Sequence, residues 1–379
     1  MVSNILSIYD LLLNLVFILL ITLIVAFITY LYNEYKVRQL LPPGPLGIPL
    51  MGYQPFFGKD LHKVVTKLGE KYGSVFTIQM GFKNIVVLND WEAIKEGLHN
   101  DALLGRPKTV LFTVGNTNSS ASSPHNWQDT RRFSLQVLRD LGFGKGSMEN
   151  RITDEIRILI KHVDEANGRR FNIHKCLTPS ISNNICHLVF GHRFDYNDPK
   201  RVAFDLMLET ISKKSIITTA FLSAAPLWLT KRMYSTGAIN SRKVFETVAG
   251  VIRSEISSHK KSMNPNNKFR DYIDGYLAEM EVRQRKDPNT HFTPQKLAEM
   301  VRILFGAGSN AVQDSIEWLL LLCVRYSEHQ KRIHEEIDSV VGRDRSPCYA
   351  DRLHMPFTQA FINESFRYKT KLPFNFMRW

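Results

Sequence analysis

The sequence has little cysteine. Only four cysteines occur among its 379 residues, and they are Cys176, Cys186, Cys323 and Cys348. No two of them are spaced as C-x-x-C and none has a histidine at metal-ligand spacing, which excludes the usual zinc motifs. So low a cysteine content in a long chain predicts reduced thiols in a cytosolic setting rather than a disulfide framework. We expect no metal ligand among the four.

Several familiar motifs are also missing. The chain contains no G-x-S-x-G and no H-E-x-x-H, and its glycine-rich segment 142–147 lacks the G-K-[ST] spacing of a phosphate loop. It has no nucleic-acid motif, and its basic residues are dispersed, so the net charge of +13 does not indicate nucleic acid. An acidic membrane surface or an acidic protein partner is the better explanation of this charge.

What is present begins with a long apolar run near the N-terminus. Residues 11–32 carry no formal charge, and as a helix these 22 residues measure about 33 Å, enough to span a bilayer core. A cleaved signal peptide would have a basic start, whereas here Asp10 precedes the run and Lys36 and Arg38 follow it. This order predicts a retained single-pass anchor with the C-terminal side in the cytosol.

The remaining chain divides into a hinge and a helical body. The prolines of segment 41–49 predict a stiff, extended hinge. The stretch 75–88 mixes β-branched and aromatic residues around a glycine turn, which predicts a hairpin. Helical periodicity then dominates, with long amphipathic stretches at 148–163, 244–261, 294–324 and 329–341. The predicted fold is mainly α with a small β portion, in three parts: an anchor (1–35), a basic and proline-rich hinge (36–50) and one large domain (51–379).

Two short motifs each place a pair of side chains on one helical face. In W-x-x-x-R, the indole N–H of Trp127 and the guanidinium of Arg131 could bind an anionic group, although a tryptophan packed on an arginine stem is the plainer explanation. In E-x-x-R, Glu364 and Arg367 most simply form a surface ion pair. A functional role for this second pair would require burial and further hydrogen-bond partners.

A third motif is a pair of glycines inside an apolar helix, in the run Phe305-Gly306-Ala307-Gly308-Ser309-Asn310. Each glycine costs roughly 1 kcal/mol relative to alanine within a helix. Either a flat cofactor or small ligand approaches the backbone here, or another helix packs closely. The sequence leaves both explanations open.

Taken in order along the chain, these signals resemble a known family. Anchor, proline-rich hinge, W-x-x-x-R, glycine-containing helix and E-x-x-R follow one another as in the microsomal cytochromes P-450, especially the clan that includes the vertebrate family-two enzymes. Longer strings are similar as well, at 103–107, 127–146, 184–196, 335–343 and 355–364. The resemblance covers essentially the whole sequence. It implies a cytochrome P-450 fold, incomplete at the C-terminus, behind an N-terminal transmembrane helix, with 51–379 as a partial catalytic domain.

The resemblance also implies roles for single residues. Trp127 and Arg131 would hold one propionate of haem b, and Arg378 falls where the family places a basic residue against the other. Glu364 and Arg367 would anchor the fold beneath the haem. The run Ala307, Gly308, Ser309 and Asn310 would line the distal groove, where oxygen and substrate meet.

The sequence departs from the family pattern at two places. Asn310 and Ala311 occupy the positions of the usual acid and threonine, and neither can act as a proton acid. Ser309, an ordered water or a substrate hydroxyl could replace that pair, or the chemistry could be closer to isomerisation or dehydration. The family's haem loop, F-x-x-G-x-x-x-C-x-G, lies beyond the E-x-x-R helix, and the sequence ends at Trp379. We therefore expect an incomplete gene model or transcript that lacks the haem-ligating cysteine, with a natural truncated isoform as the alternative.

The function that follows from the resemblance is haem-dependent monooxygenation. One atom of O2 would enter a lipophilic small molecule such as a steroid, fatty acid, terpenoid or xenobiotic, with electrons from NADPH through NADPH-cytochrome reductase and with cytochrome b5 as a further partner. The catalytic domain would face the cytosol on the endoplasmic reticulum membrane, in contact with its lipid. The alternatives are a non-catalytic tethered protein that binds lipophilic ligands or a full-length relative, and an unrelated helical membrane scaffold.

Overall fold

The structure, a computed structural model, falls into two compact units. Unit 1 comprises residues 1–104 and 215–226, and unit 2 comprises residues 105–214 and 227–379. The structure describes residues 2–58, 60–81, 83–103, 105, 124–212, 232–233, 242–263 and 268–370.

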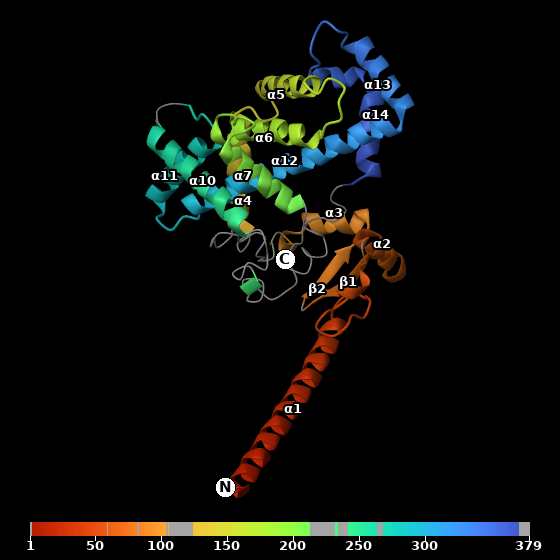
Figure 1. Cartoon of the computed structure of the whole chain (residues 1–379), viewed down its shortest axis with the longest axis vertical. Helices are drawn as coiled ribbons and strands as arrows, with labels where there is room; N and C mark the ends of the chain where they lie inside the picture. The colour runs from red at the N-terminus through yellow and green to blue at the C-terminus, as the bar shows by residue number, and fades with distance from the viewer. Residues whose placement is uncertain are drawn as a thin grey trace. The chain divides into compact units, whose positions relative to one another are not determined.

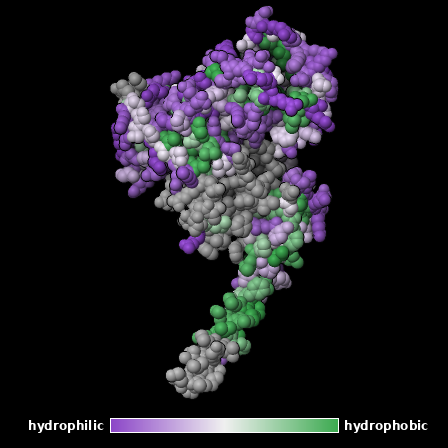
Figure 2. All heavy atoms as spheres, viewed as in Figure 1, coloured by the Kyte–Doolittle hydropathy of each residue, from purple (hydrophilic) through white to green (hydrophobic). Residues whose placement is uncertain are grey.

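Unit 1 begins with the apolar helix α1 (Val2–Gln39), whose segment Asn14–Gln39 is long and apolar enough to cross a membrane. Its described side chains form a largely hydrophobic surface that is exposed along most of its length (Figure 2). The hydroxyls of Thr22 and Thr29 donate to carbonyls one turn earlier, which satisfies them without solvent. The helix ends at Gln39, four residues past the expected boundary at residue 35. It stops before Pro42, because a proline disfavours helical geometry at the residue that precedes it.

The β portion of unit 1 is a hairpin. Strands β1 (Val75–Met80) and β2 (Lys83–Leu88) are antiparallel, in register from Val75 opposite Leu88 to Met80 opposite Lys83. Gly81 has φ of 59°, a left-handed conformation suited to a tight hairpin turn. Helix α2 (Leu61–Tyr72) packs on β1 and α3 (Trp91–His99) packs on β2, and two short 3-10 helices, η1 (Gln54–Phe56) and η2 (Asp101–Leu103), complete the described part.

The described part of unit 2 consists of helices and the turns and loops between them. In chain order its elements are α4 (Pro124–Asp140), α5 (Gly146–Asp164), α6 (His174–Phe190), α7 (Pro199–Ser212), α10 (Arg242–Ser262), α11 (Tyr272–Lys286), α12 (Pro294–Arg325), α13 (Ser327–Val340), η4 (Tyr349–His354) and α14 (Pro356–Tyr368). The 32-residue α12 is the central element, because α6, α7, α10, α11, α13 and α14 all pack against it (Figure 1).

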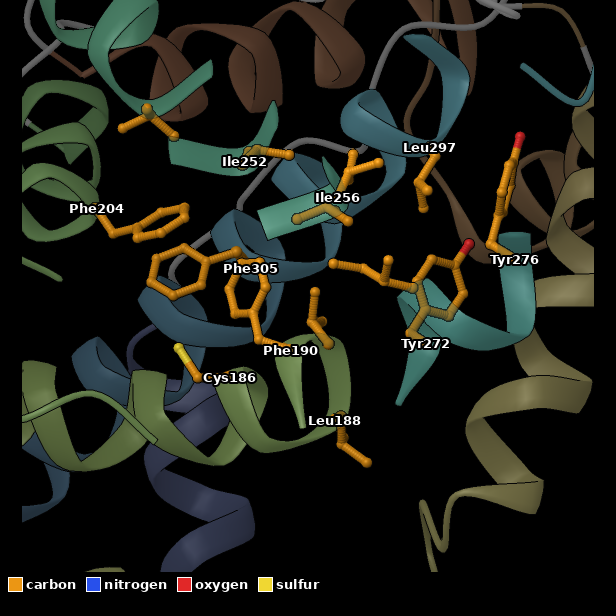
Figure 3. Close-up of a cluster of buried hydrophobic side chains, with 14 of the residues drawn as sticks. Cys186, Leu188, Phe190, Phe204, Ile252, Ile256, Tyr272, Tyr276, Leu297 and Phe305 are labelled. Atoms are coloured by element: carbon orange, nitrogen blue, oxygen red, sulfur yellow. The ribbon is translucent and has the colours of Figure 1, made fainter. Parts of the chain in front are cut away.

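Aromatic side chains from several of these helices meet in the core of unit 2 (Figure 3). Phe204 of α7 and Phe305 of α12 are fully buried, and their ring centroids lie 4.4 Å apart. The ring centroid of Phe190, on α6, lies 5.8 Å from that of Phe204. Burial of a side chain of this size contributes roughly 1.5–3 kcal/mol. The cluster therefore fixes α12 against α6 and α7.

The fold class predicted from the sequence is confirmed. The predicted hairpin at 75–88 is β1 and β2, and the four amphipathic stretches correspond to α5, α10, α12 and α13. The division into anchor, hinge and one catalytic domain stays a prediction.

Candidate functional site

The W-x-x-x-R motif lies on α4 and forms the contact that its spacing predicts. The guanidinium carbon of Arg131 lies 5.1 Å from the centroid of the Trp127 ring, a cation–π distance. Trp127 is half-buried and Arg131 is exposed. Asp129, the nearest acid on the same helix, is instead held by Arg283 of α11, whose Nη2 donates to Asp129 Oδ1 at 3.1 Å. Within the ranges that the structure describes, no carboxylate forms an ion pair with Arg131, so its N–H groups can donate hydrogen bonds to an external anion.

The two glycines of α12 have different surroundings. A Cβ atom on Gly308 would lie 2.7 Å from Cδ1 of Ile185 on α6, so Gly308 allows α12 and α6 to pack closely. At Gly306, no described atom outside the helix lies within 4 Å of where a Cβ would be. Helix packing, one of the two explanations left open by the sequence, thus accounts for Gly308 and leaves Gly306 unexplained.

The four candidate distal residues do not share one face of α12. Ala307 is exposed, Asn310 is half-buried, and Ser309 is buried with 1% of its surface exposed. Because a helix turns about 100° per residue, Ser309 lies almost opposite Ala307. Ser309 Oγ has no hydrogen-bond partner among the described residues. The structure therefore separates Ser309 from the face that carries Ala307.

A strip of exposed apolar side chains runs along the Ala307 face. Ile303, Ala307 and Ala311 follow at four-residue spacing, and all three are exposed. Two of them are alanines, so the strip offers a shallow surface to a flat apolar group. Sequence reasoning missed Ile303 as a member of this face, although its position one turn before Ala307 was a sufficient signal. We call residues 303, 307 and 311 the α12 strip.

The E-x-x-R pair forms on α14. Arg367 Nε and Nη2 donate to the two carboxylate oxygens of Glu364 at 2.7 and 2.6 Å. Hydrogen bonding between the two side chains lowers the pKa of Glu364 and raises the pKa of Arg367. The arginine and glutamate side chains are 73% and 57% exposed, so burial, which the functional explanation requires, is not present in the described structure.

The remaining candidates contribute little local geometry. Arg378 lies outside the described residues. All four cysteines are free, as expected. Cys186 is fully buried in the core, and this burial raises the pKa of its thiol, which keeps it protonated. Cys348 is exposed before η4, where its side chain caps the 3-10 helix.

Comparisons with known proteins agree with the resemblance in the sequence. The family described as "Cytochrome P450" matches residues 42–379. "Cytochrome P450 2H2" of Gallus gallus is 35% identical over 371 residues, which cover 95% of this chain and 74% of the relative. "Cytochrome P450 2C28" of Mesocricetus auratus is 33% identical over 366 residues, with coverages of 95% and 74%. "Cytochrome P450 2F2" of Rattus norvegicus is 33% identical over 375 residues, with coverages of 94% and 73%.

Proposed function

The chain belongs to the cytochrome P450 family, and on that premise we propose that it oxidises a lipophilic small molecule such as a steroid, fatty acid, terpenoid or xenobiotic. Members of this family are monooxygenases that use haem and receive NADPH-derived electrons through a reductase. Haem, when bound, supplies the activation of O2, of which one atom enters the substrate. The apolar α12 strip supports the lipophilic substrate class, because it offers no hydrogen-bonding side chain at positions 303, 307 and 311.

Two groups of residues have the chemistry that parts of a porphyrin site require. The small side chains of the α12 strip leave room for a flat ring and a substrate, and the exposed guanidinium of Arg131, oriented by Trp127, suits a propionate. They do not fit the position of the iron ligand. None of the four cysteines lies in an F-x-x-G-x-x-x-C-x-G loop, and the most buried of them, Cys186, is held as a thiol. We therefore assign no iron ligand among the residues of this sequence.

Proton delivery in this chain requires a different group from the usual acid and threonine. Asn310 and Ala311 cannot donate a proton from their side chains at neutral pH. The buried orientation of Ser309 argues against a direct role at the Ala307 face. We propose that a water, or a hydroxyl of the substrate itself, carries the proton along the α12 strip.

The observation that carries the proposal is the exposed α12 strip, and Ala307→Phe tests it. Because this sequence offers no iron ligand, the test uses the chain extended by the F-x-x-G-x-x-x-C-x-G loop of a relative. Combined with a NADPH-dependent reductase, the extended chain should consume O2 in response to a lipophilic substrate, and Ala307→Phe should abolish that response by filling the strip. Val312→Phe is the matched control, because Val312 is exposed on another face of the same helix. Equal loss in both variants would contradict the assignment of the strip.

A second measurement separates this function from the non-catalytic alternative. The absorbance spectrum of the reduced, carbon monoxide-treated protein reports directly whether a thiolate holds the iron. If the chain binds lipophilic ligands but shows no thiolate-ligated haem, the tethered ligand-binding protein becomes the favoured function.

The apolar helix and the microsomal relatives indicate a membrane-anchored protein. We propose that the anchoring membrane is that of the endoplasmic reticulum. The part of the chain after the apolar run would face the cytosol, because Lys36 and Arg38 follow that run. NADPH-cytochrome reductase and cytochrome b5 are the proposed partners, and the net charge of +13 suits docking of acidic proteins. Protease added to sealed microsomes should degrade the body, and protection of the body would contradict this orientation.

A further inference from the structure

A groove of about 720 Å³ lies in unit 1, between the proline-rich hinge and α2. We call it the hinge groove. Its apolar lining includes Pro45 and Leu46 from the hinge and Val64 and Leu68 from α2. Leu68 is buried, whereas Leu46 is 79% exposed at the rim. The groove therefore combines an apolar floor with an apolar side chain that has no described cover.

The hinge side of the groove is held in place by backbone contacts. The amide of Thr77 on β1 donates to the carbonyl of Pro43 at 2.9 Å. A Cβ atom on Gly44 would lie 1.9 Å from the carbonyl oxygen of Thr77, so only glycine allows the hinge to approach the strand this closely. The groove is thus a formed feature of unit 1 rather than a gap beside a loose linker.

The other side of the groove is positively charged. Lys67 and Lys71 follow at four-residue spacing on α2, and both line the groove and are exposed. Lys71 Nζ lies 5.2 Å from the ring centroid of Tyr72, which also lines it. None of the lining residues is acidic, and neither lysine forms an ion pair within the described part of the chain. An apolar floor beside two ammonium groups that have no described carboxylate partner suits an amphipathic anion.

The hinge groove is also directly connected to the end of the anchor. Arg38, in the last turn of α1, donates from Nη1 to the carbonyl of Pro45 at 3.3 Å and from Nη2 to Gln79 of β1 at 3.1 Å. Glu34, one turn earlier on α1, accepts from Asn84 at the tip of the hairpin at 3.5 Å. The end of α1 and the hairpin therefore lie side by side (Figure 1). The wall of the groove is therefore hydrogen-bonded to the last turn of the apolar helix α1.

We propose that the hinge groove binds one anionic phospholipid of the anchoring membrane, with its head group at Lys67 and Lys71 and the start of its acyl chains along Leu46, Val64 and Leu68. The proposal rests on membrane anchoring by α1 and is independent of the oxidation chemistry. It assigns to α2 a role in orienting unit 1 on lipid, in addition to the anchor itself.

Lipid titration of the full chain in detergent tests the proposal. Native mass spectrometry should show tighter binding of phosphatidylserine than of phosphatidylcholine. Lys67→Gln/Lys71→Gln should weaken phosphatidylserine binding by roughly 5-fold for each lysine, because a basic residue at an anionic lipid surface contributes about a 5-fold gain. The control is Lys63→Gln/Lys95→Gln, which removes the same charge from exposed lysines of unit 1 that do not line the groove. Equal weakening by both double variants would indicate general charge attraction and overturn the proposal.

Two further arms distinguish a lipid site from a simple anion site. Val64→Trp fills the floor without changing charge and should weaken phosphatidylserine binding, and unchanged binding would overturn the role of the floor. Excess inorganic phosphate should leave bound phosphatidylserine in place, whereas complete displacement would show a free-anion site instead. Circular dichroism of each variant, matching that of the wild type, confirms that the fold is retained.

Discussion

Gly308 of α12 lies against Ile185 of α6 so closely that a Cβ atom on the glycine would be 2.7 Å from Ile185 Cδ1. Gly306, two residues earlier, has open space at the corresponding point within the described structure. The two glycines look equivalent in the sequence, yet only one of them is required for helix packing.

The first prediction follows from this difference. Gly306→Ala should stabilise the chain by about 0.5–1 kcal/mol, because alanine is the better helix former and nothing opposes its methyl group. Gly308→Ala should lose that gain through a packing cost of roughly 1–3 kcal/mol. Thermal unfolding followed by circular dichroism compares the two. Ile185→Val should rescue Gly308→Ala by removing the opposing Cδ1, and a lack of rescue would contradict the packing explanation.

The second prediction concerns the buried hydroxyl of Ser309. Because its Oγ has no described partner, Ser309→Ala should leave stability unchanged or raise it, by up to roughly 1 kcal/mol. If Ser309 does not face the Ala307 side, the ratio of product formed to NADPH consumed, measured in the chain extended by the haem loop of a relative, should stay at the value without the substitution. A fall in that ratio with unchanged stability would show that Ser309 takes part in proton delivery after all.

The third prediction tests the anion-binding role of Arg131. Arg131→Gln should lower the haem-to-protein ratio of the purified chain, because one charge-assisted contact to a propionate is lost, at a cost of about 1.5–3 kcal/mol. Arg132→Gln is the matched control, since Arg132 is an exposed arginine on the next position of α4. Equal haem content in the two variants would remove Arg131 from the proposed site.

The fourth prediction is a pH dependence at His259, a buried residue of α10. Its Nδ1 donates to the carbonyl of Glu255 at 2.7 Å and its Nε2 donates to Asp271 Oδ2 at 2.9 Å, so both ring nitrogens have acceptors. Asp274, itself paired with Arg270, lies nearby. Burial lowers the pKa of His259, but the hydrogen bond and charge of Asp271 outweigh it, and the pKa is raised above 6.5.

The sign of this effect is fixed by linkage. Because the pKa of His259 is higher in the folded state than in the unfolded state, protonated His259 stabilises the fold. This stabilisation is fully present below pH 6.5 and is lost as the pH rises through the folded-state pKa. The melting temperature should therefore fall over that range. His259→Ala should lower the free energy of unfolding by about 3–5 kcal/mol, because Asp271 is left buried without its partner. The same substitution should remove this pH dependence. His62→Ala, at an exposed position of α2, should retain it.

Much of the fold could be predicted from local patterns. The apolar helix near the N-terminus, the hairpin at 75–88 and the periodicity of α5, α10, α12 and α13 depend on composition and on spacings within a few residues. The contact between Trp127 and Arg131 and the ion pair of Glu364 and Arg367 also follow from four- and three-residue spacing on a helix. These features are local, so they can be derived from the residues alone.

The candidate site could be predicted only in part. Spacing identified Ala307 and Gly308, but it could not show that Gly308 meets Ile185, that Ser309 is turned inward, or that the Glu364 pair is exposed. The pairing of His259 with Asp271 and the groove between the hinge and α2 were missed altogether.

The sequence by itself therefore determined the long apolar helix near the N-terminus, the mainly helical body and the family, because each follows from composition, periodicity or the order of motifs. The tertiary structure decided which face of α12 is free and which is packed, and which charges are paired. Those properties depend on contacts between helices distant along the chain, and no local pattern specifies which helices meet.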